Sequence, residues 1–286
     1  MAEPGSFGTR PLTSFRNDGL VFDVSEHGPR DGVPLVLLHG FPQRATCWAG
    51  VTPLLTARGL RVLAPDQRGY SPGARPSGRA AYRIGHLVAD VVTLIEAAGP
   101  GPVHLVGHDW GAAVGWALAA TRPDLVRSFT ALSVPHPRAI AGSLLSSRQA
   151  LMSWYVAAIQ VPLVPELVAA RWPGWIEHNL RRSGMDHAQL ERFRTEILAD
   201  GVLPGALGWY RAIPFGGPGG PRAITVPTTL IWSDADVAIS RAAAERCLEF
   251  VAVDYRLEIL AGVDHWIPER APARLAELIT ERTSAS

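Results

Sequence analysis

The pentapeptide Gly107-His108-Asp109-Trp110-Gly111 places a carboxylate where a sharp turn could present it to a substrate. It lies between an apolar run at 103–106, typical of a buried strand, and a helical pattern that starts near residue 112. A tight strand-to-helix elbow needs small residues two positions before and after its centre, and glycine stands at both. An Asp that simply caps a helix is the plainer interpretation. The two glycines favour the elbow and predict Asp109 as a nucleophile at a helix N-terminus, where negative charge is stabilised.

A second segment, His39-Gly40-Phe41-Pro42, follows the apolar run at 33–38. A turn in this place can offer one backbone N–H to an oxyanion, here from Phe41, and the second N–H would come from Trp110. Taken alone, His-Gly-x-Pro indicates only a turn, and His39 is predicted to be a structural hydrogen-bonding residue. Its position relative to the elbow is what suggests an oxyanion hole.

The acid and the base expected beside Asp109 follow the last two apolar runs. Asp234 and Asp236 come after the run at 228–231, and His265 comes after the run at 255–260. Nucleophile, acid and His in this chain order form a hydrolytic triad. The two acids are two residues apart and could face the same way in an extended loop, so spacing alone leaves both open. Of the nine histidines, His265 is the one placed for catalysis.

These residues need a rigid scaffold, and the rest of the sequence predicts one. Apolar runs typical of strands buried on both faces recur at 33–38, 61–64, 103–106, 129–132, 228–231 and 255–260, after a hairpin at 14–26. Helical patterns are predicted at 82–98, 112–121, 241–250 and 271–281. Such alternation predicts an α/β fold with a mostly parallel sheet and helices on both of its faces.

The alternation stops between residues 135 and 222, where the sequence is helical and rich in tryptophan. We interpret 135–222 as a helical cap inserted into a core formed by 1–134 and 223–286. The Gly/Pro-rich stretch at 215–221 is predicted to be the linker that returns the chain to the core.

Over nearly its whole length the chain resembles the epoxide hydrolase branch of the α/β-hydrolase superfamily. The Asp-Trp elbow, the His-Gly-Phe-Pro turn and the acid and His loops all fit, as does Arg68-Gly69-Tyr70-Ser71 after the second core strand. The family's acid usually ends a Trp-Gly-x-x-Asp pattern. In this chain Trp232-Ser233-Asp234-Ala235-Asp236 puts Asp236 at that end, although Ser233 replaces the usual Gly.

Two tyrosines of the predicted cap sharpen the resemblance. Tyr155 stands seven residues before Pro162, and Tyr210 lies within the triplet Trp209-Tyr210-Arg211, as two tyrosines of the family do. Each could equally be an amphipathic residue packed in the cap. The resemblance implies instead that both hydroxyls bind the epoxide oxygen.

The implied activity is hydrolysis of an apolar small-molecule epoxide to a vicinal diol, with neither cofactor nor metal. Asp109 would open the ring to form a covalent ester while Tyr155 and Tyr210 protonate the developing alkoxide. His265, held by Asp236, would activate the water that cleaves the ester.

Two alternatives stay open. A haloalkane dehalogenase shares the fold, the Asp, the His and the ester intermediate, and Trp110 fits its common halide-binding position. Phe41 stands where that family usually has Asn or a similar donor, and the two tyrosines also favour an epoxide. A non-catalytic ligand-binding member of the fold could keep an intact triad, which slow turnover with tight product binding would indicate.

The composition of the chain limits which partners it can have and indicates its cellular compartment. The chain has 27 basic and 26 acidic residues in 286, so it generates no long-range field that would attract nucleic acid or a membrane, and we expect neither as a partner. All 27 basic residues are arginine, which excludes a Schiff-base lysine or a P-loop lysine. Cys47 and Cys247 are predicted to be reduced and buried. Without an apolar leader or spanning segment we expect a cytoplasmic protein, and a homo-oligomer is left open.

Overall fold

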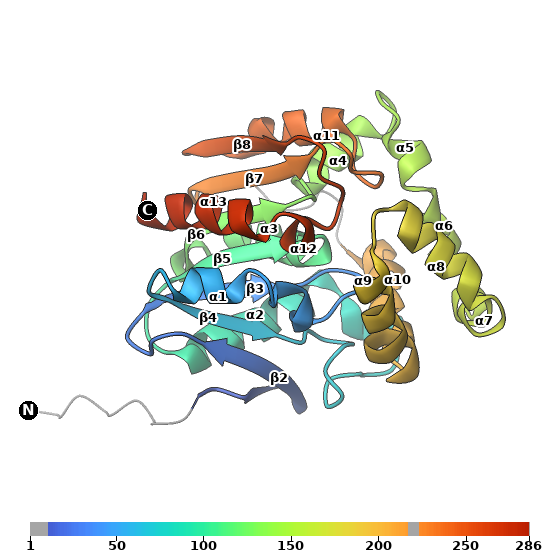
Figure 1. Ribbon diagram of the computed structural model, residues 1–286, viewed down its shortest axis with the longest axis horizontal. Helices are drawn as coiled ribbons and strands as arrows, with labels where there is room; N and C mark the ends of the chain where they lie inside the picture. Colours follow the sequence, from blue (N-terminus) through green and yellow to red (C-terminus); the bar gives the residue numbers. More distant parts are fainter. Residues whose placement is uncertain (1–10, 217–222, 286) are drawn as a thin grey trace, which may run out of the picture.

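The computed structural model describes residues 11–216 and 223–285 and is built on an eight-stranded sheet (Figure 1). The strand order is β1-β2-β4-β3-β5-β6-β7-β8. The first two strands form the predicted hairpin, β2 pairs antiparallel with β4, and every pair from β4 to β8 is parallel. The strands are β1 (Ser14–Asn17), β2 (Leu20–His27), β3 (Val33–Leu38), β4 (Leu60–Pro65), β5 (Val103–His108), β6 (Val126–Leu132), β7 (Thr228–Ser233) and β8 (Tyr255–Leu260).

Strand β3 shows why the apolar runs become central strands. Leu35 and Leu37 belong to one cluster of buried side chains, whereas Val36 and Leu38 belong to the other, and all four are fully buried. Successive side chains of a strand point to opposite faces, so a strand covered on both faces needs an apolar residue at every position. The predicted parallel sheet with helices on both faces is confirmed.

Two sets of helices cover the two faces of the sheet. α2 and α3 contribute to the cluster that contains Val36, and α1 and α13 to the cluster that contains Leu35. The helix predicted at 241–250 is shorter than expected, because its second half tightens into the 3-10 helix Arg246–Phe250 and sets Cys247 in the core. The helices of the core are α1 (Thr52–Thr56), α2 (Ile84–Ala98), α3 (Trp110–Thr121), α11 (Arg241–Glu245), α12 (Ile267–Arg270) and α13 (Pro272–Ser284).

Seven α-helices occupy the stretch predicted as a cap, and Figure 1 shows most of them beside the sheet rather than on its faces. The boundary between the predicted cap and the core stays a prediction. The predicted return linker at 215–221 lies largely outside the described residues, which omit 217–222. None of the helices in the described ranges is long and apolar enough to cross a membrane. The seven are α4 (Pro137–Ser143), α5 (Gln149–Met152), α6 (Trp154–Ile159), α7 (Val164–Arg171), α8 (Pro173–Arg182), α9 (His187–Arg192) and α10 (Leu203–Ala212), with the π-helix Phe193–Ala199 before α10.

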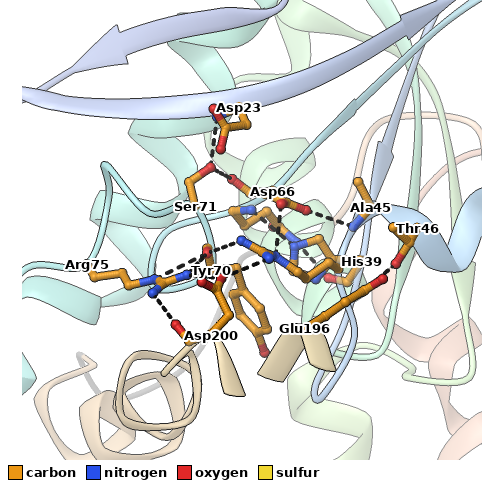
Figure 2. A network of polar contacts seen from close by, with 12 residues as sticks. Asp23, His39, Ala45, Thr46, Asp66, Tyr70, Ser71, Arg75, Glu196 and Asp200 are labelled. Carbon is orange, nitrogen blue, oxygen red and sulfur yellow. Dashed lines mark hydrogen bonds and ion pairs between the residues drawn. The ribbon is translucent and has the colours of Figure 1, made fainter. Parts of the chain in front are cut away.

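Polar side chains tie this helical stretch to the core (Figure 2). Asp200, just after the π-helix, accepts hydrogen bonds from Arg75 at 2.7 Å and from Arg44 at 3.0 Å. Nearby, Thr46 donates to Glu196 at 2.7 Å. Exposed ion pairs contribute little one by one, but two arginines converging on one carboxylate form a network. These contacts hold the segment between α9 and α10 against the core.

Candidate active site

Strand β5 ends in the sharp elbow that the sequence predicts. Asp109 has φ 51° and ψ −118°, a backbone conformation that costs a non-glycine residue energy and persists only where the surroundings impose it. A Cβ atom on Gly107 would lie 2.3 Å from the carbonyl oxygen of Gly111, and one on Gly111 would lie 2.2 Å from that of Leu38. Both glycines are therefore required by space, and they allow the elbow to lift Asp109 above the sheet.

The turn after β3 packs directly against the Asp109 carboxylate. The backbone N–H of Phe41 donates to Asp109 Oδ1 at 2.8 Å. A Cβ atom on Gly40 would lie 2.3 Å from Asp109 Cβ, so the turn can come this close only because residue 40 has no side chain. Trp110 is the first residue of α3, and N–H groups in the first turn of a helix have no partner within it. Both predicted oxyanion donors thus flank the carboxylate.

His265 lies between two carboxylates. Its Nδ1 is 2.8 Å from Asp236 Oδ2, and its Nε2 is 3.6 Å from Asp109 Oδ2. The second oxygen of Asp236 accepts the backbone N–H groups of Ala238 at 2.7 Å and Ile239 at 3.0 Å, which fixes the carboxylate. Asp234 instead accepts the N–H of Gly262 at 2.7 Å. Of the two acids that spacing left open, the structure brings Asp236 to His265.

The three groups shift one another's protonation. Burial by itself would lower the pKa of His265, but the charges and hydrogen bonds of Asp236 and Asp109 outweigh burial and raise the pKa to about 10. Burial would likewise raise the pKa of Asp109, yet the hydrogen bond and charge of His265 hold that pKa below its ordinary value. At neutral pH the free site therefore holds an imidazolium between two carboxylates.

The two predicted tyrosines meet over this cluster, although they come from α6 and α10. The rings of Tyr155 and Tyr210 lie 5.9 Å apart, and Tyr210 also makes edge contacts with Trp110 at 4.9 Å and Phe41 at 5.3 Å. Burial raises the pKa of both phenols, and the charge of Asp109 raises it further. Both hydroxyls consequently stay neutral and can donate a proton.

Comparison with known proteins gives the family. A family model described as alpha/beta hydrolase fold matches residues 33–163. The AB hydrolase superfamily protein YfhM of Bacillus subtilis is 34% identical over 92% of this chain and 94% of its own, and epoxide hydrolase 2 of Caenorhabditis elegans is 32% identical over 86% and 72%. The crystal structure of epoxide hydrolase A from Mycobacterium thermoresistibile superposes with a TM-score of 0.80 at 27% identity, over 95% of this chain and 97% of that one. The chain belongs to the epoxide hydrolase branch of the α/β-hydrolase superfamily.

Three polar residues of this α/β-hydrolase hold the loop of His265 in place, and the sequence did not predict this role for them. His108 Nε2 and Ser133 Oγ both donate to the backbone carbonyl of His265, each at 2.9 Å. Ser233 Oγ donates to the carbonyl of Asp264 at 2.8 Å, so the serine that replaces the family's usual glycine joins the acid loop to the His loop. Contacts to a backbone carbonyl across such separations leave no pattern in the sequence. His108 is the exception, because its place before the nucleophile could have marked it.

In this family member, glycines also decide how close α10 comes to the core. A Cβ atom on Gly205 would lie 2.5 Å from the carbonyl oxygen of Gly69, and one on Gly208 would lie 2.7 Å from the ring of Tyr82. Trp209 Nε1 donates to the carbonyl of Arg68 at 2.7 Å. The segment 68–71, which resembles the corresponding segment of the family, therefore packs directly against α10. This contact holds Tyr210, a residue of α10, at the site.

Within residues 11–216 and 223–285, no group of three or more His, Cys, Asp or Glu side chains is placed to hold a metal ion. The other conspicuous histidines lie elsewhere. His39 accepts the N–H of Gln67 at 3.1 Å, as expected of a structural residue, and His136 stacks on Phe250.

Proposed function

We propose that this hydrolase opens an apolar epoxide to a vicinal diol through an ester on Asp109. The observation that carries the proposal is a buried carboxylate at a strained elbow with two neutral phenols, Tyr155 and Tyr210, on the same site. The relatives named epoxide hydrolase support the substrate class. A carboxylate attacks amides and esters poorly, but it can displace an oxygen from an sp³ carbon when that oxygen is stabilised.

In the first step an oxygen of Asp109 attacks one ring carbon, and the carbon–oxygen bond of the epoxide breaks. The electron pair remains on the ring oxygen, which takes a proton from Tyr155 or Tyr210. An alkoxide is far more basic than a phenolate, so the transfer is favourable even from phenols whose pKa is raised by burial. The outcome is a neutral hydroxyalkyl ester of Asp109 and a tyrosinate, and the tyrosinate regains its proton from the imidazolium of His265, which becomes neutral.

In the second step His265 deprotonates a water molecule that attacks the carbonyl carbon of the ester. Esterification removes the charge of Asp109, one of the two charges that raise the pKa of His265, and this allows the imidazole to act as a base. Backbone N–H groups of Phe41 and Trp110 stabilise the tetrahedral oxyanion. Its collapse breaks the bond to the alkyl oxygen, which takes the proton that His265 removed from water and leaves as the second hydroxyl of the diol. The carboxylic acid left on Asp109 then gives its proton to His265, which restores the starting site.

The rings around Tyr210 favour an apolar substrate. Phe41, Trp110 and Tyr155 present aromatic surface to it, and such surface binds aliphatic or aromatic groups better than charged ones. We keep the expectations of a small-molecule substrate, of no cofactor and of a cytoplasmic protein with an open oligomeric state.

A haloalkane dehalogenase is the second candidate, and one contact favours it. Trp110 follows the nucleophile and lies against Tyr210, where an indole N–H could face a departing halide. A halide leaves without needing a proton, however, so two phenols would have no role in that reaction. Phenols are required only where an alkoxide forms.

The decisive experiment offers styrene oxide, a long-chain epoxide and a 1-haloalkane to the protein and follows diol and halide together. We expect diol from an epoxide and at most slow halide release. His265→Gln should form the ester but not cleave it, so mass spectrometry should find an adduct on the peptide that contains Asp109. Asp109→Ala is the matched control and should show neither adduct nor turnover. Halide release faster than diol formation would favour dehalogenation, and binding without any turnover would indicate a receptor.

A further inference from the structure

The outward side of the stretch 145–175, which contains α5 to α7 and the start of α8, is apolar, and this is unusual for the surface of a globular protein. Seven large side chains there are more than half exposed: Leu145 at 101%, Leu151 at 76%, Leu163 at 68%, Trp172 at 62%, Trp154 at 57%, Leu167 at 53% and Trp175 at 53%. Figure 1 shows α6, α7 and α8 along the rim of the molecule, away from the sheet. We call these seven residues the outer cap face. Contiguous apolar surface of this kind normally marks an interaction site.

The exposure follows helical periodicity, so it belongs to a face and is not scattered. On α7, Val164, Leu167 and Arg171 stand at helical positions i, i+3 and i+7 and are all exposed, whereas Ala169 on the opposite side is buried. On α6, Trp154 is exposed while Ile159 is buried. A surface helix normally turns a polar side outward. Helices that are apolar on both sides need a second apolar partner.

The charges that stay unpaired around this face are positive, because the carboxylate of Glu177 on α8 is bound by Arg194. Glu166 is the only acidic residue between positions 125 and 176, and its carboxylate binds Arg211 on α10. Arg148, Arg171 and Arg182 are exposed and form no ion pair within the described parts of the chain. Exposed tryptophan and leucine beside unpaired arginine suit the headgroup region of a bilayer that carries anionic lipid.

We propose that the outer cap face docks on an anionic lipid surface, with its tryptophans and leucines at the headgroup level and its arginines on lipid phosphates. A second copy of the chain fits less well, because a twofold contact would bring the same arginines face to face while Glu166 and Glu177 are already bound by Arg211 and Arg194. The near-neutral net charge, from which we expected no membrane partner, excludes only a long-range field. A local patch acts within a Debye length.

Docking there would also serve the reaction, and this part rests on the proposed function. Trp154 and Tyr155 are neighbours on α6. Trp154 is exposed on the outer cap face, whereas Tyr155 contacts Tyr210 at the site. Apolar epoxides concentrate in bilayers by the same hydrophobic effect that buries apolar side chains. A site whose cap lies on the lipid would draw substrate from that pool.

The test is vesicle flotation of the full chain with phosphatidylcholine alone and with phosphatidylcholine mixed with phosphatidylglycerol. We expect at least tenfold stronger binding to the anionic vesicles at low salt, and a steep loss of binding at high salt. The double variant Leu167→Ser, Trp172→Ser should lose about tenfold or more, and Arg148→Gln, Arg171→Gln should weaken the binding and its salt dependence. Two variants outside the cap are the matched controls and should bind as wild type. Leu248→Ser changes a leucine of the core that is 61% exposed, and Arg16→Gln changes an exposed arginine on strand β1.

Absence of binding to anionic vesicles at low salt overturns the proposal, and so does equal binding by the outer-face variants and the controls. A dimer in light scattering that the Leu167→Ser, Trp172→Ser variant dissociates would assign the face to a second copy instead. Flotation needs no turnover, so it reports on the lipid surface even where the epoxide assay fails. Turnover of a water-soluble epoxide by the outer-face variants shows that they are folded.

Discussion

Replacing His265 by Gln should remove a fall in stability that the wild-type protein shows between pH 6.5 and 9.5. The charges of Asp236 and Asp109 overcome burial and raise the pKa of His265 in the folded protein to about 10, against 6.5 for the ordinary side chain. In this window the folded protein still binds the proton and the unfolded chain has lost it. The contribution of His265 to stability is therefore complete below pH 6.5 and is lost as the pH rises toward 10.

The magnitude follows from the shift. Each pKa unit corresponds to about 1.4 kcal/mol, so between pH 7 and pH 9 the unfolding free energy should fall by about 2 to 3 kcal/mol on account of this group. Little is lost to solvent screening, because the side chains of His265 and Asp236 are only 5% and 0% exposed. The Gln variant should be less stable than wild type at pH 7, since it leaves two buried carboxylates without their cation, and the gap should narrow at pH 9.

The assay is urea unfolding followed by circular dichroism at pH 7, 8 and 9. Other titrating groups act on both proteins, so the difference in unfolding free energy isolates His265. Asp109→Asn is a graded second variant, because it keeps the Asp236 contact and should retain part of the slope. Parallel pH profiles for wild type and His265→Gln would show that His265 is not held as an imidazolium in the free site.

Three further changes test how the site is assembled. Gly40→Ala should lower the rate of ester formation by a hundredfold or more in rapid-quench kinetics, because the new Cβ would lie 2.3 Å from that of the nucleophile. Arg211→Met should cost about 1.5 to 3 kcal/mol in urea unfolding, because it removes the charged hydrogen bonds of Arg211 to the half-buried Glu166 and the one to Ile159 that joins α10 to α6, and Glu166→Gln should cost less. Asp236→Asn should slow single-turnover ester hydrolysis far more than Asp234→Asn, and the reverse order would contradict the contact of Asp236 with His265.

The parts of the site that could be predicted from sequence are those fixed by local backbone geometry. The elbow follows from two glycines flanking Asp109, because a Cβ at either position collides with neighbouring backbone. The same holds for the turn that carries Phe41. Parallel strands then bring their carboxyl ends to one edge of the sheet, which is why loops more than 200 residues apart converge. Apolar runs were enough to predict that sheet.

What escaped prediction depends on contacts that no local pattern records. Spacing alone could not choose between Asp234 and Asp236, because it does not show that two backbone N–H groups fix the second oxygen of Asp236; the resemblance to the family chose Asp236. The hydrogen bond from Ser133 to the His265 carbonyl likewise leaves no pattern in the sequence, whereas the position of His108 directly before Asp109 could have marked that residue. The outer cap face was hidden for another reason, because a helix that is apolar on both sides does not reveal which side meets the core.

The candidate site combines residues of the core with two tyrosines of the helical stretch 135–222. The nucleophile and the His265 pair are set by the rigid strand ends of the core, whereas the phenols come from α6 and α10. The proton donors therefore reach the nucleophile only while α10 stays on Gly69 and the Asp200 network holds the segment before it. In the proposed mechanism, the contacts that hold α10 and the segment before it on the core would therefore affect ester formation, whereas ester cleavage would use residues of the core. Loosening the Asp200 contacts should accordingly slow ester formation and leave ester hydrolysis unchanged.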